Sequence, residues 1–143
     1  ENRQLIREVQ IDNSIRWQRD HWRTLTSCYN RSPFFEHYAT FLTGFYEKHY
    51  KWLWDFDLEL FHFLAKQMKL ARSVSLTQNF EKVPDQAVFD LRGTLRSGKF
   101  LITDQRPYAQ VFGSDFEKNL SIFDTIFNMG PETSSYLSGH LTI

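Results

Sequence analysis

A histidine lies between two tryptophans near the start of a segment whose apolar residues otherwise recur at helical spacing. His21 has Trp17 on one side and Trp22 on the other, and a neutral imidazole beside flat indole rings can act as a general base next to a stacking platform for a ligand. The alternative is a packed His21 whose ring nitrogens bond to a portion of the protein that precedes this chain. We take His21 as the candidate catalytic base, with Trp17 and Trp22 as binding residues.

A second polar set interrupts an apolar pattern near the end of the chain. Asp124 lies inside a helical run that is otherwise rich in Leu, Ile and Phe. Asn128 follows it by one turn, and Asn119 or Ser121 can cap the start of the same helix. Capping does not explain Asp124, so we expect Asp124 to be catalytic and the other three to bind a ligand. Because a buried polar group without a partner costs about 1–3 kcal/mol, His21 and Asp124 are expected to share one pocket.

Four arginines form the densest group of cations: Arg16, Arg19, Arg23 and Arg31. Guanidinium forks can hold the pyrophosphate of a nucleotide sugar, which makes Arg23 and Arg31 candidate binding residues. Asp20 lies one turn from Arg16 and from Arg23. The alternative is therefore a solvated helix face that is paired with its own acid.

The sequence contains none of the common motifs for a metal site, a phosphate-binding loop or a serine nucleophile. No CxxC or HExxH sequence occurs and no two histidines lie four residues apart on one helix, so we predict no metal site. Neither a glycine-rich phosphate loop nor a GxSxG sequence is present, and no motif identifies a cofactor. Cys28 is either a nucleophile activated by His21 or a buried structural residue, the commoner fate of a cysteine. The five histidines are His21, His37, His49, His62 and His140.

The amino-acid composition limits the kinds of binding partner and the cellular location that we expect for this protein. Lys plus Arg and Asp plus Glu both count 17, so the net charge is zero, whereas a dedicated nucleic-acid surface needs a basic excess. No run approaches the 18 apolar residues of a membrane span. One cysteine cannot form an internal disulfide, which fits a reducing compartment, and we expect a cytoplasmic protein.

Periodicity predicts the elements that must position these residues. Helices are expected over residues 15–29, from Pro33 with Ser32 as cap, from near Asp55, from the 119–121 region to Gly130, and over 131–137. Short strands are expected over 4–11 and 71–80. Residues 81–105 fit a helix at 85–95 or a strand at 88–92. The predicted fold is mainly α: an α+β helical domain with a minor β component.

The third of these helices is apolar nearly all round, which is typical of a central helix. Phe56, Leu60, Phe63 and Leu64 are its expected core residues. No repeat or linker occurs, so residues 1–143 are expected to form a single domain. The chain begins without Met at an apparent strand, which we interpret as the C-terminal part of a longer chain. An apolar surface left uncovered in this way favours self-association.

Several runs of residues resemble one family of proteins. They are 17–23 (WQRDHWR), 29–36 (YNRSPFFE), 55–60 (DFDLEL), 108–112 (YAQVF), 119–124 (NLSIFD) and 127–132 (FNMGPE). In this order they cover nearly the whole chain, and the sequence resembles the WbqC-like family of bacterial proteins. It departs from the family at 115–118 (DFEK), where such proteins often carry Gly and Pro, and it begins after their N-terminal region.

The resemblance implies a role in bacterial surface-polysaccharide biosynthesis, including O-antigen synthesis. By extension it implies acyl or aminoacyl transfer to an amino sugar or a nucleotide sugar. Such a transfer needs a base to deprotonate the amine and donors to hold an oxyanion. His21 is the base in this interpretation, and Asn128 or Asn119 holds the oxyanion.

The alternative function is a non-catalytic sugar-binding or protein-interaction module. Its contact surface would be formed by Trp17, Trp22 and Tyr29, because exposed aromatic rings stack on sugars and bases. A cleft that gathers His21 and Asp124 favours the enzyme, whereas scattered and satisfied polar residues favour the module.

Overall fold

The computed structural model describes residues 4–70, 74–77 and 105–139. Within these residues the chain is helical, and strand-type pairing is confined to an isolated antiparallel bridge between Gln10 and Trp52. The mainly α prediction is confirmed, and in the described part the minor β component amounts to that bridge. The elements in order are a 3-10 helix η1 (Ile6–Glu8), α1 (Trp17–Tyr29), α2 (Phe35–Glu47), α3 (Leu53–Gln67), α4 (Ile122–Met129), a 3-10 helix η2 (Gly130–Glu132) and α5 (Thr133–Ser138).

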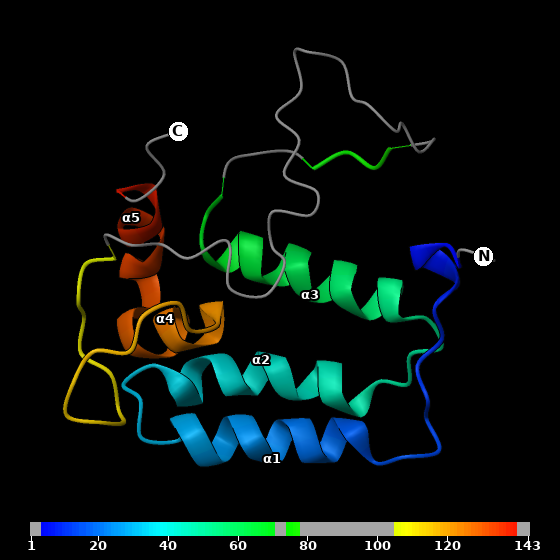
Figure 1. Ribbon diagram of the computed structural model, residues 1–143, viewed down its shortest axis with the longest axis horizontal. Coiled ribbons are helices and arrows are strands. Elements are labelled where there is room, and N and C mark those ends of the chain that lie inside the picture. The colour runs from blue at the N-terminus through cyan, green and yellow to red at the C-terminus, as the bar shows by residue number, and fades with distance from the viewer. Residues whose placement is uncertain (1–3, 71–73, 78–104, 140–143) are drawn as a thin grey trace.

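The first three α-helices lie side by side and alternate in direction (Figure 1). α1 packs directly on α2. Aromatic rings join α2 to α3, with ring centroids 5.2 Å apart for Phe45 and Phe63 and 6.2 Å apart for Tyr46 and Phe56. As a consequence, the start of α1 and the end of α2 lie at the same end of the helix pair (Figure 1).

The inner face of α1 passes through Trp22, Leu25 and Tyr29. Leu25 and Tyr29 are buried and Trp22 packs against the core, whereas His21 and Cys28 are exposed. The predicted apolar face that includes His21 and Cys28 is therefore wrong at these two positions. The larger rings of α1 turn toward the neighbouring helices, and this rotates the smaller residues outward.

α2 begins at Phe35, two residues after Pro33. The prediction of Ser32 as its N-cap is wrong, because the buried Ser32 hydroxyl has no hydrogen-bond partner among the described residues. The Ser32 carbonyl instead accepts from the Phe35 N–H at 3.1 Å, and the Phe34 N–H donates to the Phe127 carbonyl at 3.0 Å. The start of α2 is thus determined by a link to α4 and not by a side-chain cap.

Of the four core residues that the sequence predicts in α3, two are buried. Phe56 and Leu64 are buried, while Leu60 and Phe63 are half-buried against the core. Phe61 is 45% exposed, so within the described residues α3 forms one side of the bundle and is not its centre. Because apolar residues occur on every side of α3, the sequence alone did not show which face of this helix packs against the other helices.

α4 is the most buried of the described helices, since residues 123–127 are all buried. The Ser121 hydroxyl accepts from the Phe123 N–H at 3.3 Å, which confirms Ser121 as the cap. Gly130 ends the helix at a φ of 54°, and a Cβ there would lie 2.6 Å from ring atoms of Phe34. The predicted stop and the short helix that follows it are confirmed.

The predicted strand over residues 4–11 is wrong. Its middle is a turn of 3-10 helix. Two hydrogen bonds of 3.0 Å join its end to the start of α3 and the residues just before it: Ile11 N–H donates to the Lys51 carbonyl, and Leu53 N–H donates to the Val9 carbonyl. The alternation of apolar residues covers only Val9 and Ile11, which is too short for a strand. Residues 74–77 have no regular structure. The rest of the strand predicted at 71–80, and the alternatives at 85–95 and 88–92, lie outside the described residues.

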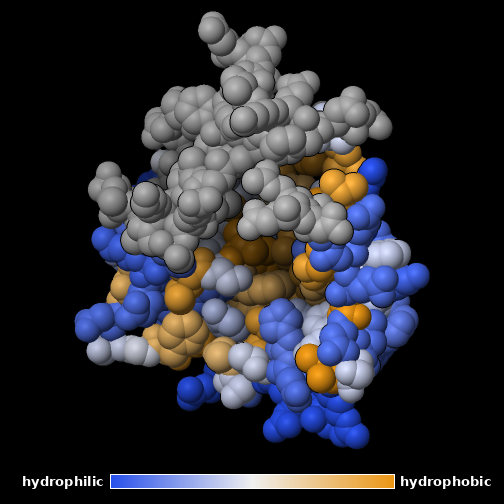
Figure 2. Space-filling model, turned by 45° about the vertical axis from the view of Figure 1, so that its right-hand side comes forward, coloured by the Kyte–Doolittle hydropathy of each residue, from blue (hydrophilic) through white to orange (hydrophobic). Residues whose placement is uncertain are grey.

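The surface carries both polar and apolar side chains. Phe41 and Phe61 are among the large apolar residues exposed to solvent, and Figure 2 shows apolar atoms bordered by hydrophilic ones on the face it presents. None of the helices in the described ranges is long and apolar enough to cross a membrane. Self-association through such apolar surface stays a prediction.

Candidate functional site

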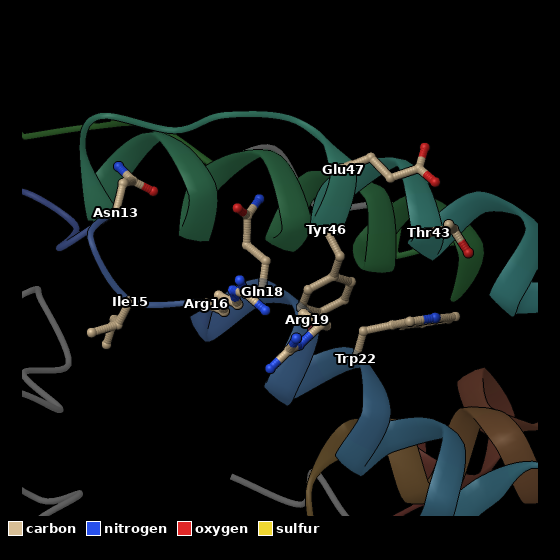
Figure 3. A pocket seen from close by; sticks show the side chains of 9 residues that line it. All are labelled: Asn13, Ile15, Arg16, Gln18, Arg19, Trp22, Thr43, Tyr46 and Glu47. Carbon is tan, nitrogen blue, oxygen red and sulfur yellow. The ribbon is translucent and has the colours of Figure 1, made fainter.

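An open pocket of about 490 Å³ lies between the start of α1 and the end of α2. Arg16, Gln18, Arg19 and Trp22 line it from the side of α1. Thr43, Tyr46 and Glu47 line it from α2, which runs above α1 in Figure 3. The pocket therefore combines two guanidinium groups, a carboxylate and an indole.

The first turn of α1 contributes positive charge to this pocket. Arg16 is the N-cap residue and makes no side-chain cap hydrogen bond. The N-terminus of a helix carries about half a positive charge, to which the two guanidinium groups add. Arg19 is paired with Asp20 at 3.2 Å, but both side chains are more than half exposed, and such a surface pair contributes only about 0–1 kcal/mol. An incoming anion can therefore compete for Arg19.

The indole of Trp22 packs against two other aromatic rings. Its centroid lies 5.4 Å from that of Tyr46 and 6.1 Å from that of Phe35. Burial raises the pKa of Tyr46 to about 12, so its phenol is neutral at physiological pH. The Tyr46 hydroxyl is buried and has no hydrogen-bond partner within the described residues. Trp22 is thus a preorganised flat surface at the wall of the pocket.

Two side-chain amides fix the rim. The Gln18 amide donates to the Lys48 carbonyl at 2.6 Å, which ties α1 to the residue after α2. The Asn13 amide donates to the Tyr50 carbonyl at 2.8 Å, and its oxygen accepts from the Trp17 indole N–H at 3.3 Å. Trp17 also packs edge-on against Phe56 at 5.2 Å and does not line the pocket. Trp17 thus holds Asn13, a residue at the edge of the pocket, in place.

His21 lies next to this pocket without lining it. The imidazole is exposed, and its edge packs against the ring of Tyr46 at 5.4 Å. It takes part in none of the hydrogen bonds found among residues 4–70, 74–77 and 105–139. A base that is exposed and not held by another side chain can exchange protons with a ligand.

Arg23 and Arg31 lie further along the same helix and beyond its end. Arg23 lines a second, more open hollow of about 410 Å³ with Cys28. Arg31 is exposed and lines neither hollow. Cys28 is exposed, so the expectation of a buried structural cysteine is wrong. In the described part of the chain, no three side chains that bind metals gather in one place.

Asp124 is fully buried in a hydrogen-bond network that joins α4 to the segment before it. One carboxylate oxygen accepts from the Tyr108 hydroxyl at 2.5 Å and from the Gln110 amide at 2.8 Å. The other accepts from the Asn128 amide at 3.1 Å. The sequence analysis did not predict Tyr108 and Gln110 as partners of Asp124, although both belong to the YAQVF run. The signal that could have found them is their spacing of two residues, which places both side chains on one side of an extended segment.

The remaining residues predicted for this second set have local roles. The Asn128 amide also donates to the Asp124 carbonyl at 2.8 Å. The Asn119 N–H donates to the Gln105 side-chain oxygen at 2.7 Å, and Asn119 adopts a φ of 58°. Ser121 caps α4. These contacts are local to α4 and to the segment before it.

The structure does not bring His21 and Asp124 together. Asp124 neighbours Tyr29 at the far end of α1, where burial and then the Asp124 charge raise the pKa of Tyr29 to about 12. His21 lies eight residues earlier, which is about 12 Å along the helix axis. It contacts Tyr46, whereas the partners of Asp124 come from the 105–119 segment and α4. The prediction that His21 and Asp124 share one pocket is therefore wrong. His21 packs against Tyr46, and Asp124 is bonded to Tyr108, Gln110 and Asn128.

Comparison with known proteins places the chain in a family. Searches against curated proteins and against solved structures gave no match. A family model described as the WbqC-like protein family matches residues 1–97, which is more than half of the chain and includes all of α1, α2 and α3. The chain therefore belongs to the WbqC-like protein family.

Proposed function

We propose that this protein acts in bacterial surface-polysaccharide (O-antigen) biosynthesis, in the cytoplasm, by binding a nucleotide sugar in the pocket between α1 and α2. The observation that carries the proposal is the combination of Arg16, Arg19 and Trp22 around one open pocket at the first turn of α1. Its volume of about 490 Å³ lies within the usual range for small-molecule sites.

Each part of a nucleotide sugar has a matching group in the pocket. A pyrophosphate carries negative charge, for which the guanidinium groups of Arg16 and Arg19 and the helix N-terminus are suited. A nucleobase stacks on an indole, and stacking tolerates different bases because every base has a flat face. Polar side chains on α2, such as Thr43, supply hydrogen-bonding groups to a sugar.

A binding experiment tests this proposal. Titration calorimetry with UDP-, GDP- and dTDP-linked glucose is expected to show saturable binding that weakens as salt is added. The Arg16→Ala/Arg19→Ala variant is expected to bind about tenfold more weakly or worse, since charge-assisted hydrogen bonds contribute about 1.5–3 kcal/mol. The charge-matched control Arg7→Ala/Lys66→Ala changes two exposed cations outside the pocket and is expected to bind normally. Absence of binding for all three sugars would contradict the proposal.

The second candidate function is acyl or aminoacyl transfer to an amino sugar held in the same pocket. The position of His21 favours it, because the exposed imidazole packs on Tyr46, which lines the pocket. Neutral His21 would take the proton of the sugar amine while the nitrogen attacks the carbonyl of an activated acyl donor and the leaving group departs. Asp124 has no part in this scheme.

Product formation separates transfer from binding alone. The protein is incubated with UDP-glucosamine and a panel of acyl and aminoacyl thioesters, and mass spectrometry measures the N-acylated product. Transfer is expected to be lost in His21→Gln with sugar binding retained, and to persist in His37→Gln, which changes an exposed histidine on α2. If the sugar binds and no donor yields product, the non-catalytic sugar-binding module is the better description.

A further inference from the structure

The two walls of the α1–α2 pocket carry opposite charge. Arg16 and Arg19 line the pocket from α1, and Glu47 lines it from α2. In Figure 3 the Glu47 side chain extends along the upper side of α2, and its carboxylate lies apart from the two guanidinium groups. Neither ion pair found among the described residues includes Glu47: one joins Arg19 to Asp20, and the other joins Lys48 to Glu59. The Glu47 carboxylate is thus available to a ligand.

The helix termini reinforce this separation of charge. Glu47 is the last residue of α2, where the helix dipole places about half a negative charge, while the α1 wall is a helix N-terminus. Lys48 is the cation nearest to Glu47 in sequence. Its ammonium group bonds to Glu59 at 2.5 Å and lies over the ring of Tyr50, so it is engaged on the side of α3. The negative wall of the pocket is therefore not neutralised by its neighbour.

We propose that Glu47 selects nucleotide sugars that carry a free, protonated amine, which it binds while Arg16 and Arg19 hold the phosphates. This inference rests on the proposed binding of a nucleotide sugar in the same pocket. A ligand with an anionic end and a cationic end matches both walls, whereas a neutral sugar leaves the Glu47 carboxylate without a partner. N-acetylation of the amine removes the positive charge and with it the attraction.

Calorimetry with three probes that differ at one position tests the inference: UDP-glucosamine, UDP-N-acetylglucosamine and UDP-glucose, at a pH at which the amine is protonated. The protein is expected to bind the amine form about three- to fivefold more tightly than the other two, the range of a solvent-exposed ion pair. In Glu47→Gln this preference is expected to disappear, with binding of UDP-glucose equal or tighter. Added salt is expected to reduce the preference.

Glu36→Gln is the matched control, since Glu36 is an exposed acid in the first turn of α2, about 16 Å along the helix from Glu47. It is expected to keep the full preference. Equal binding of all three probes by the unaltered protein, or a preference that survives in Glu47→Gln, overturns the role of Glu47 and leaves the proposed function standing. Absence of binding for all three overturns both.

Discussion

The Tyr108 hydroxyl donates a hydrogen bond of 2.5 Å to the carboxylate of Asp124, a side chain with no exposed surface. Burial and this carboxylate both raise the pKa of Tyr108, which keeps the phenol protonated and able to donate. With Gln110 and Asn128 as further donors, the carboxylate replaces its lost hydration by three hydrogen bonds. The network fastens the 105–119 segment onto α4.

Tyr108→Phe is expected to destabilise the protein by about 1–3 kcal/mol. The substitution removes one donor from a buried carboxylate and leaves part of its charge unsatisfied. Urea titration followed by circular dichroism measures the free energy of unfolding. A loss below about 0.5 kcal/mol would show that Asp124 is stabilised chiefly by its other partners.

Tyr46→Phe is expected to have the opposite outcome, with no loss of stability or a gain of up to about 1 kcal/mol. The Tyr46 hydroxyl is buried and without a hydrogen-bond partner in the described part of the protein, so its removal ends a desolvation cost. The same chemical change at Tyr108 makes the two variants controls for each other in one urea series. A marked destabilisation in Tyr46→Phe would reveal a hydrogen bond to this hydroxyl.

Stability is expected to fall as the pH rises above about 10. Tyr29 and Tyr46 have pKa values raised to about 12, chiefly by burial. A tyrosine with a raised pKa binds its proton more tightly in the folded state. Its contribution is complete below the unfolded pKa of about 10 and is lost as the pH passes from there through about 12. Urea titrations at pH 8, 10 and 11 measure this slope, which is expected to be shallower in Tyr46→Phe; an unchanged slope would contradict the assignment.

Phe127→Ala is expected to cost about 3–5 kcal/mol, whereas Phe61→Ala is expected to cost less than about 1 kcal/mol. Phe127 has no exposed surface and contacts the rings of Tyr29 and Phe35 at 5.2 and 5.1 Å. Phe61 lies on α3 and is 45% exposed. Thermal and urea unfolding of both variants compare a fully buried ring of α4 with a half-exposed ring of α3. Equal losses would contradict the exposure of Phe61.

The positions of the helices follow from local sequence signals, but the direction in which each helix faces does not. The periodicity of residues 15–29, the Ser121 cap and the stop at Gly130 all have local causes, and each is found in the structure. Which of the α1 side chains turn inward depends on Phe35 and Tyr46 of another helix, to which Trp22 is adapted. His21 was therefore placed on the wrong side.

In the candidate site, too, residue types could be recognised from the sequence, whereas tertiary contacts between them could not. The arginines and Trp22 were recognised from their types, and the structure places Arg16, Arg19 and Trp22 around one pocket. Glu47 was not recognised, because it lies 25 residues beyond Trp22 in the sequence and reaches the same pocket only through the antiparallel packing of α1 and α2. Asp124 was noticed because it interrupts an apolar run, yet its partners Tyr108 and Gln110 are joined to it by tertiary contacts alone.

The glycine that ends α4 ties two distant positions of the chain to each other. Because a Cβ on Gly130 would collide with the ring of Phe34, a side chain at one position demands a smaller one at the other. Gly130→Ala is expected to be tolerated only with a reduced residue at 34, and then incompletely, since the φ of 54° still disfavours any side chain. In an alignment of this family, residues 34 and 130 are expected to covary. Such covariation would report the contact between the start of α2 and the end of α4 without any structure.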